Sequence, residues 1–198
     1  MDDMFRLRAV LPMAMVMALA PAFGSSAAAA PAPSVDVYED FLCPYCAAFD
    51  QQYGSELENA ARSGRIKLHY HFVNKLDRLS ASGDYSSRAA GAARCVANLA
   101  PSRLAAFRSR LFAPDVQPEE EGDSDLSNGD LARISTEAGA GAAAACVRQG
   151  AQVATAKSEA AAQLAKLAAE GGRGVPSVAK NGKIVDVDDP AWLENLAS

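Results

Sequence analysis

The sequence has no surplus of positive charge. Its 198 residues include 19 lysines and arginines against 24 aspartates and glutamates, which gives a formal net charge of −5 at neutral pH. A protein that binds the phosphate backbone of a nucleic acid needs a basic face, so this balance argues against DNA or RNA as a partner. The densest acidic stretch, residues 119–125, is interpreted as a solvated loop rather than a metal site.

The chain also lacks a long apolar run. The run at residues 9–20 has only 12 residues, whereas a membrane-spanning helix needs about 20. Arg6 and Arg8 precede it and a tract of small residues follows it, which is the order found in secretory signal peptides. We therefore expect residues 1–29 to be a signal peptide cleaved near Ala29, with an uncleaved anchor as the alternative. The mature protein would then lie in the periplasm or in the extracellular, cell-wall space.

Cysteine is scarce, and all four cysteines follow the predicted signal peptide. They are Cys43, Cys46, Cys95 and Cys146. In an oxidising compartment outside the cytoplasm, cysteines are usually paired. Four cysteines allow three pairings, however, so their number alone does not decide which of them are partners.

The segment around the first two cysteines predicts a strand, a helix and a second strand. Residues 34–38 alternate valine with other residues, which favours a short strand. Apolar residues then recur at helical spacing from Pro44 until Gly64 supplies a stop. Pro44 suits the first helical turn because no helical hydrogen bond needs its missing N–H there. Residues 66–73 alternate again and complete a βαβ unit.

The middle of the chain predicts helices. It is rich in alanine and poor in β-branched residues, and a polar, acidic loop is expected at residues 114–129. The helices are expected at residues 85–99, 102–112, 131–138, 142–148 and 151–170.

The end of the chain returns to strands. Residues 177–180 and 183–187 flank Asn181 and Gly182, and this dipeptide between two short strands is a strong hairpin signal. A last helix is expected to begin at Pro190.

Together these elements predict one domain at residues 30–198. Its core would consist of residues 34–73 and 172–198, in the order βαβ and ββα around a mixed sheet. An α-helical subdomain would be inserted at about residues 74–171. The fold class is therefore α/β.

Cys43 and Cys46 are separated by two residues at the start of the first predicted helix. The unpaired N–H groups and the dipole of a helix N-terminus favour negative charge, so they lower the pKa of the first thiol. Thiolate is the species that exchanges disulfides, and the second cysteine lies close enough to attack a mixed disulfide on the first. The pattern predicts redox chemistry at this pair, and no small-molecule cofactor is indicated.

Three other uses of this pair are alternatives. A zinc site would need further ligands, for which His69 and His71 on one side of the second strand are candidates. We interpret both histidines as ordinary residues of a half-exposed strand. A c-type haem would need histidine where Ala47 stands. A purely structural disulfide would close a loop of only four residues, which removes little chain entropy.

The stretch from Val35 to Cys46, VDVYEDFLCPYC, resembles the active-site segment of DsbA-like thiol–disulfide oxidoreductases of the thioredoxin superfamily, specifically their exported branch in bacteria with high-GC genomes. The segment GVPS at residues 174–177 is similar to the cis-proline loop of that family. The helical insertion, the hairpin and the last helix also agree with it. The resemblance covers nearly all of the chain from Val35 onwards and implies a thioredoxin-like fold.

The resemblance implies that the Val175–Pro176 peptide bond is cis and that the backbone of Val175 pairs with a substrate segment as an added strand. A trans proline that opens an ordinary strand is the alternative. We expect Phe41, Leu42 and Tyr45 to join this loop in an apolar rim that unfolded substrates touch.

Two positions depart from the family pattern. Strongly oxidising members carry histidine at the position of Tyr45, where it stabilises the first thiolate, whereas Cys-Pro-Tyr-Cys is typical of glutaredoxins. Many thioredoxin-like enzymes also keep a buried carboxylate six residues before the first cysteine, where this chain has Val37. Glu39 or a water could take over that role. We therefore expect a reduction potential that is oxidising but not extreme.

Cys95 and Cys146 both lie in the predicted helical insertion, 51 residues apart. Similar exported family members carry a second disulfide, which implies that these two cysteines pair with each other when Cys43 and Cys46 form the redox couple. Such a bridge would stabilise the domain by ~4 kcal/mol in the chain-entropy model. Two buried, unbridged thiols are the alternative.

The resulting hypothesis is an exported enzyme that introduces disulfides into reduced or unfolded secreted proteins through Cys43 and Cys46. The resemblance also implies a quinone-linked membrane oxidase that regenerates the disulfide. The alternatives are an extracytoplasmic reductase of the cytochrome-maturation type, a metal-handling module that adds His69 or His71 to the cysteines, and a redox-inert peptide-binding module.

Overall fold

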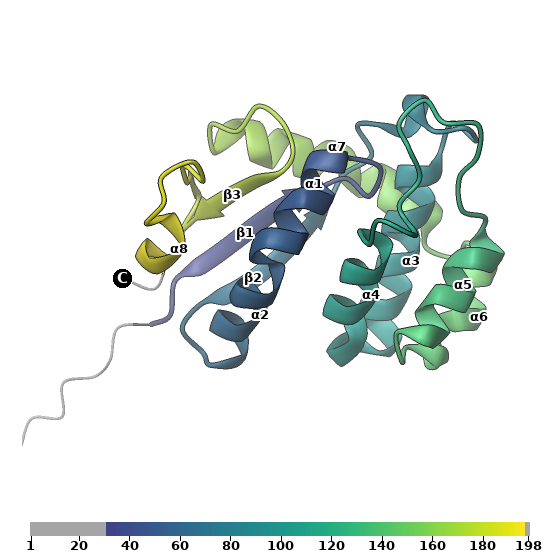
Figure 1. Cartoon of the computed structure of the whole chain (residues 1–198), viewed down its shortest axis with the longest axis horizontal. Coiled ribbons are helices and arrows are strands. Elements are labelled where there is room, and N and C mark those ends of the chain that lie inside the picture. The colour runs from purple at the N-terminus through teal and green to yellow at the C-terminus, as the bar shows by residue number, and fades with distance from the viewer. Residues whose placement is uncertain (1–30, 197–198) are drawn as a thin grey trace, which may run out of the picture. The chain divides into compact units, whose positions relative to one another are not determined.

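A four-stranded mixed sheet with the strand order β2-β1-β3-β4 organises this computed structural model (Figure 1). β1 (Ser34–Glu39) runs parallel to β2 (Lys67–Phe72) and antiparallel to β3 (Ser177–Lys180). β3 pairs antiparallel with β4 (Lys183–Ile184). The parallel pair comes from the βαβ unit, the antiparallel pair of β3 and β4 comes from the hairpin, and β3 also joins β1 antiparallel. The predicted mixed sheet is therefore confirmed.

The structure describes residues 31–196, and the predicted signal peptide at residues 1–29 lies outside them. The described residues belong to one compact unit. Within this part of the chain no helix is both long enough and apolar enough to cross a bilayer.

One face of the sheet is covered by the crossover between the two parallel strands and by the last helix. The crossover consists of α1 (Pro44–Phe49), a π-helical turn (Asp50–Gly54) and α2 (Ser55–Arg62), and α8 (Trp192–Asn195) packs beside it. The ring centres of Phe49 and Trp192 are 5.9 Å apart. The buried residues on this face are Val35, Val37, Phe49, Leu57, Ala60, Ile66, Val178, Trp192 and Leu196.

The opposite face is covered by α7 (Val153–Ala169). Side chains alternate along β1, so Tyr38 points to this side and packs with Leu167 and Ala179. The same helix also packs against α3 (Tyr85–Leu99) of the insertion. α7 therefore belongs both to the predicted insertion and to the layer that closes the sheet.

The remaining insertion helices are α4 (Leu104–Leu111), α5 (Asn128–Glu137) and α6 (Ala144–Arg148). α3 has the predicted bounds, and the acidic segment before α5 is a loop as predicted. α5 begins three residues earlier than expected because Ser127 and Asp130 cap its N-terminus reciprocally.

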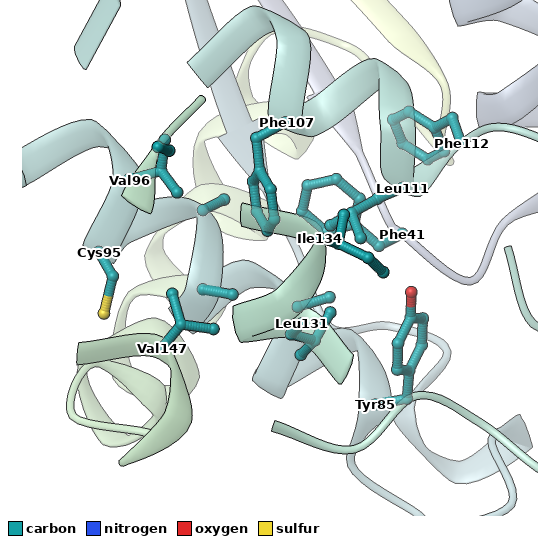
Figure 2. Close-up of a cluster of buried hydrophobic side chains, with 14 of the residues drawn as sticks. Phe41, Tyr85, Cys95, Val96, Phe107, Leu111, Phe112, Leu131, Ile134 and Val147 are labelled. Atoms are coloured by element: carbon teal, nitrogen blue, oxygen red, sulfur yellow. The ribbon is translucent and has the colours of Figure 1, made fainter. Parts of the chain in front are cut away.

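The insertion has a hydrophobic cluster of its own, which Figure 2 shows between helices and the segment after β1. Its largest fully buried side chains are Tyr85, Phe41, Phe107, Phe112, Leu42, Leu111, Leu131 and Ile134. The cluster also includes Cys43, Cys46 and Cys95. It therefore connects the insertion directly to the predicted active site.

Two elements at the C-terminal end are shorter than predicted. β4 ends at Ile184, after which only the Val185 N–H still donates to a β3 carbonyl, that of Val178, at 2.8 Å. α8 begins at Trp192 rather than at Pro190 because Asp189 first organises a turn, in which its carboxylate accepts the Ala191 N–H at 2.9 Å.

Candidate active site

Cys43 and Cys46 lie at the N-terminus of α1, next to the end of β1. Cys43 is the N-cap residue, with 4% of its surface exposed, and Cys46 in the first turn is fully buried. Both are free thiols. Pro44 and Tyr45 between them are exposed, Tyr45 to 74%. The motif therefore presents its two inner residues to solvent and keeps the second sulfur inside.

A tight turn fixes the position of Cys43. Its N–H donates to the carbonyl of Asp40 at 3.0 Å, and its own carbonyl accepts the N–H groups of Cys46 and Ala47 at 3.1 and 3.2 Å. Only the four residues 40–43 lie between the end of β1 and the start of α1, and this short turn places the first sulfur at the positive end of the helix dipole.

The two thiols have opposite electrostatic surroundings. A hydrogen bond from the Cys46 thiol lowers the pKa of Cys43, and backbone N–H groups at the helix start add to this shift while burial opposes it. Burial raises the pKa of Cys46, and its hydrogen bond to Cys43 and the charge of Glu39 raise it further. Negative charge is therefore favoured on Cys43, and the proton is retained on Cys46.

The loop before β3 lies directly beside the first cysteine. Its Val175–Pro176 peptide bond is cis, and the carbonyl oxygen of Val175 is 3.7 Å from the Cys43 sulfur. Both loop residues are half-buried. Because β3 pairs with β1, the sheet itself brings this loop to the motif across 132 residues of sequence.

The prediction that Phe41 and Leu42 form part of an exposed apolar rim is wrong. Both side chains are fully buried in the insertion cluster. The Phe41 ring stacks on Phe72 and Phe112, with ring centres 4.7 and 5.1 Å apart. Figure 2 shows Phe41 and Phe112 in this cluster. The insertion folds over the segment that precedes the motif, so its apolar residues form core. The exposed rim is left to Tyr45 and the cis-proline loop.

Arg108 on α4 binds two carboxylates behind the active site. Its Nε donates to Glu39 Oε2 at 2.6 Å, its Nη2 donates to the other oxygen of the same carboxylate, and its Nη1 donates to Asp50. The Arg108 and Glu39 side chains are fully buried. Burial raises the pKa of Glu39, and the guanidinium opposes that shift. This two-pronged pairing compensates charges that could not otherwise be buried.

Glu39 supplies a buried carboxylate where Val37 does not. Val37 packs in the apolar core on one face of the sheet, and Glu39, two residues later on the same strand, points to the same side. The charge of Glu39 acts on the Cys46 thiol. The sequence left Glu39 or a water as the substitute for the missing carboxylate. The structure shows Glu39 in electrostatic contact with Cys46.

Sequence analysis did not identify Arg108 or Gln117. Arg108 falls within the apolar stripe that Leu104, Phe107 and Leu111 form on α4, and a charge inside such a stripe is a signal for a buried ion pair. Gln117 in the acidic loop gives no comparable signal.

The Gln117 side chain holds the active-site turn from the insertion. Its Nε2 donates to the carbonyls of Phe41 and Cys43 at 3.1 and 3.0 Å. These carbonyls lie before and at the first cysteine, so the amide links the acidic loop to the motif. A side chain 74 residues away in sequence from Cys43 thus supports its position.

The other two cysteines lie in the insertion. Cys95 on α3 and Cys146 on α6 form a disulfide with an S–S distance of 1.97 Å. Cys95 is buried and Cys146 half-buried. The pairing is the one that the family resemblance implies, and it leaves the motif cysteines to each other.

The two histidines do not join the cysteines. His69 is exposed on β2, and His71 lies on the α7 side of the sheet, where its Nε2 is 2.5 Å from Asp36 Oδ1 and its ring stacks on Tyr38. Among residues 31–196 no group of three or more His, Cys, Asp or Glu side chains is arranged to hold a metal ion. This arrangement gives the metal-handling alternative no support.

Comparison with known proteins agrees with this geometry. Residues 20–196 match the family model described as Thioredoxin. The chain belongs to the thioredoxin family. The family predicted from the motif and its loop is thereby confirmed.

Solved structures narrow the placement within the thioredoxin family. The chain is similar to a disulfide bond oxidoreductase of Mycobacterium tuberculosis named DsbG, with 32% identity, a TM-score of 0.73, and coverage of 83% of this chain and 76% of that one. It is also similar to DsbA of the same organism, with 31% identity, a TM-score of 0.72, and coverage of 84% and 83%. MdbA of Corynebacterium diphtheriae, a thiol–disulfide oxidoreductase, has 25% identity, a TM-score of 0.71 and 83% coverage of both chains.

A curated relative of a different kind also matches. The serine/threonine-protein kinase PknE of Mycobacterium tuberculosis is 35% identical over 165 residues, which cover 82% of this chain. The chain spans only 29% of that kinase's length, so this match gives no reason to expect kinase activity in it.

This thioredoxin-family protein is a thiol–disulfide oxidoreductase of the DsbA and MdbA type, with Cys43 and Cys46 as its Cys-x-x-Cys pair.

Proposed function

We propose that the chain introduces disulfides into exported proteins through a Cys43–Cys46 disulfide. The observation that supports this direction is the asymmetry of the two thiols, in which negative charge is favoured on Cys43 and the proton on Cys46. Stabilising the reduced, ionised pair makes the disulfide form a stronger oxidant. The buried Glu39–Arg108 pair supports the same asymmetry because Glu39 keeps the Cys46 thiol protonated.

The reaction consists of two exchanges. A substrate thiolate attacks the Cys43 sulfur, forms a mixed disulfide and displaces Cys46, which takes up a proton. A second thiolate of the same substrate then attacks the substrate sulfur of the mixed disulfide and releases Cys43 as a thiolate. The substrate loses two electrons to form its disulfide, and the cysteine pair gains them.

The surface around the motif suits an extended, unfolded substrate. The exposed Tyr45 ring offers an apolar contact, and the Val175 carbonyl beside the Cys43 sulfur is positioned for backbone pairing with a substrate strand. Export of the chain and reoxidation by a quinone-linked membrane oxidase complete this proposal. Both rest on the N-terminal sequence pattern and on the family resemblance.

The proposal is tested by the redox equilibrium of the mature protein with glutathione and by the oxidative refolding of a reduced, unfolded ribonuclease. We expect a reduction potential between about −120 and −230 mV and stoichiometric transfer of disulfides to the ribonuclease. The Cys46→Ser variant should accumulate a mixed disulfide on Cys43 instead. A potential near the thioredoxin value of about −270 mV, without disulfide transfer, would show that the protein is a reductase.

A further inference from the structure

We propose that the buried carboxylate of Asp40 tunes the reactivity of Cys43, so that its negative charge limits the oxidising strength of the active site. Asp40 would be a positioning residue that acts through the charge of the cysteine and not by contact with substrate. The inference rests on the proposed exchange at Cys43 but not on its direction.

Asp40 is fully buried and held by three hydrogen-bond donors. Its Oδ1 accepts the backbone N–H of Leu42 at 3.0 Å and the hydroxyl of Ser86 at 2.5 Å, and its Oδ2 accepts the N–H of Leu76 at 3.0 Å. Its own backbone carbonyl accepts the N–H of Cys43. The residue therefore closes the turn that carries the first cysteine and joins that turn to the start of α3.

No cation compensates this carboxylate. Asp40 forms no ion pair with any arginine, lysine or histidine of residues 31–196, whereas its neighbour Glu39 is paired with Arg108. The side-chain charge of Asp40 interacts with Cys43, Asp77 and Tyr85, none of which is basic. The Asp40 backbone also forms a hydrogen bond with the Cys46 thiol, and an Asp40→Asn substitution leaves that backbone in place. In a medium of low dielectric constant an uncompensated charge acts strongly on its neighbours, and Cys43 is three residues away.

The charge of Asp40 depends on pH near neutrality. Burial raises the pKa of Asp40 to about 6, although its three donors favour the ionised form. The ionised carboxylate raises the pKa of Cys43 and so opposes the donors at the helix start. Above about pH 6 the ionised Asp40 therefore raises the pKa of Cys43. Below about pH 6 Asp40 becomes neutral and this effect is lost.

The neighbouring carboxylates of Glu39 and Asp40 have opposite effects on the reduced cysteine pair. Glu39 acts on Cys46 and keeps its proton in place, whereas Asp40 acts on Cys43 and makes its thiolate less favourable. The first favours the reduced, singly ionised pair and the second opposes it. Asp40 thus provides a physical reason for an oxidant of intermediate strength that is independent of Tyr45.

The test is the pH dependence of Cys43 alkylation by iodoacetamide in the reduced full mature protein, together with its equilibrium with glutathione. In the Asp40→Asn variant we expect the pKa of Cys43 to fall by about one unit. The equilibrium should shift up to tenfold toward the reduced protein, which corresponds to a potential about 30 mV more oxidising.

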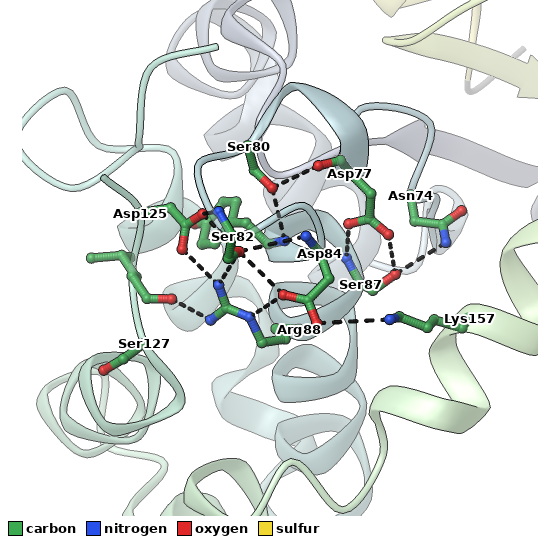
Figure 3. Close-up of polar contacts among 12 residues, drawn as sticks. Asn74, Asp77, Ser80, Ser82, Asp84, Ser87, Arg88, Asp125, Ser127 and Lys157 are labelled. Carbon is green, nitrogen blue, oxygen red and sulfur yellow. Dashed lines mark hydrogen bonds and ion pairs between the residues drawn. The ribbon is translucent and has the colours of Figure 1, made fainter. Parts of the chain in front are cut away.

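Two further variants distinguish an electrostatic effect of Asp40 on Cys43 from a structural role of Asp40 in the turn. Ser86→Ala removes a donor that favours ionised Asp40, so it should lower the pKa of Cys43 in the same direction by a smaller amount. Asp77→Asn is the matched control, because Asp77 also accepts a backbone N–H and a hydroxyl at the start of α3, both from Ser87 (Figure 3). The charge of Asp77 raises the pKa of Asp40, so Asp77→Asn keeps Asp40 ionised. It should therefore not lower the pKa of Cys43, in contrast to Asp40→Asn.

An unchanged or raised pKa of Cys43 in folded Asp40→Asn would overturn the proposal, since a merely structural role would loosen the turn and return the thiol toward its free value. If Asp40→Asn does not fold, an unchanged Cys43 in Ser86→Ala would overturn it equally. Failure of the proposed oxidase direction would instead appear in the potential of the unmodified protein. The two failures are therefore distinguishable.

Discussion

Both cysteine pairs border the same hydrophobic cluster, yet they differ in nearly every other respect. Cys43 and Cys46 lie at the start of a helix, next to an exposed tyrosine and the cis-proline loop, and remain free thiols. Cys95 and Cys146 join two helices of the insertion and are bonded to each other.

The comparison shows that burial alone does not decide what a cysteine does. Cys46 and Cys95 are equally buried, with 0% and 1% of their surface exposed. Cys46 differs because Glu39 and Cys43 act on its proton and because its partner lies within the same helical turn. A pair three residues apart closes a short loop that adds little stability, whereas a pair 51 residues apart closes a long one.

The largest effect is expected from Cys43→Ser. Without the sulfur that the substrate thiolate attacks, disulfide transfer to a reduced protein should fall by at least ~10³-fold. The measurement is the rate at which a reduced ribonuclease regains activity. The double variant Cys95→Ser/Cys146→Ser is the control and should retain transfer while folded. Comparable losses of disulfide transfer in both variants would contradict the assignment of Cys43 and Cys46 as the redox pair and of Cys95 and Cys146 as a structural disulfide.

The second effect is on stability and belongs to the other pair. Cys95→Ser/Cys146→Ser should lower the free energy of unfolding by ~4 kcal/mol, because the unfolded chain is no longer constrained by the long loop. Urea denaturation should be compared in a Cys43→Ser background, so that the motif forms no disulfide in either protein. A change well below 1 kcal/mol would contradict a structural role for this bridge.

The third effect is a pH dependence specific to the motif. In the reduced protein the lowered pKa of Cys43 contributes stability that is present above the unfolded value of about 8.5 and is lost as pH falls through the folded pKa. The raised pKa of Cys46 acts in the opposite sense, since above about pH 8.5 the unfolded chain releases a proton that the folded chain keeps. The difference in unfolding free energy between reduced and oxidised motif should therefore rise with pH and then fall.

Urea denaturation across this pH range checks the third effect. Neither slope should exceed about 1.4 kcal/mol per pH unit for a single proton. Asp40 titrates in both redox forms, so most of its contribution cancels in the difference. A difference that only falls between pH 6 and pH 10 would show that the thiolate of Cys43 is not stabilised.

The smallest effect is expected from Gln117→Ala. Loss of its two hydrogen bonds to the active-site turn should cost about 1 kcal/mol of stability and change the alkylation rate of Cys43 a few-fold. Gln51→Ala is a matched control, because the Gln51 amide also donates to a backbone carbonyl, that of Phe112 at 3.2 Å, but away from the motif. Equal alkylation rates of Cys43 in the two variants would show that Gln117 does not support the position of the active-site turn.

Much of the fold could be predicted because its signals are local. The alternation of residues 34–38, the proline after Cys43 and the Asn181-Gly182 turn each specify backbone conformation over a few residues. α3 ends at Leu99 because Pro101 disfavours helical backbone angles at Ala100, the residue that precedes it.

The burial of Phe41 and Leu42 could not be predicted in this way. Their neighbours in sequence are a strand and an active-site motif, which favours an exposed rim. In space the Phe41 ring stacks on Phe72 and Phe112, and Leu42 lies in the same insertion cluster. Nothing near position 41 indicates that the insertion returns to cover this segment.

The sequence by itself determined the chemistry of this protein, since two cysteines at a helix start require only local geometry to become a redox pair. It also determined the family, through the motif and the glycine-valine-proline loop. The tertiary structure decided how the pair is tuned, because the groups that act on it are brought together from far apart in the chain. Arg108 reaches Glu39 across 69 residues and Ser86 reaches Asp40 across 46. Electrostatic effects depend on distance and burial in the folded state, and periodicity along the chain encodes neither.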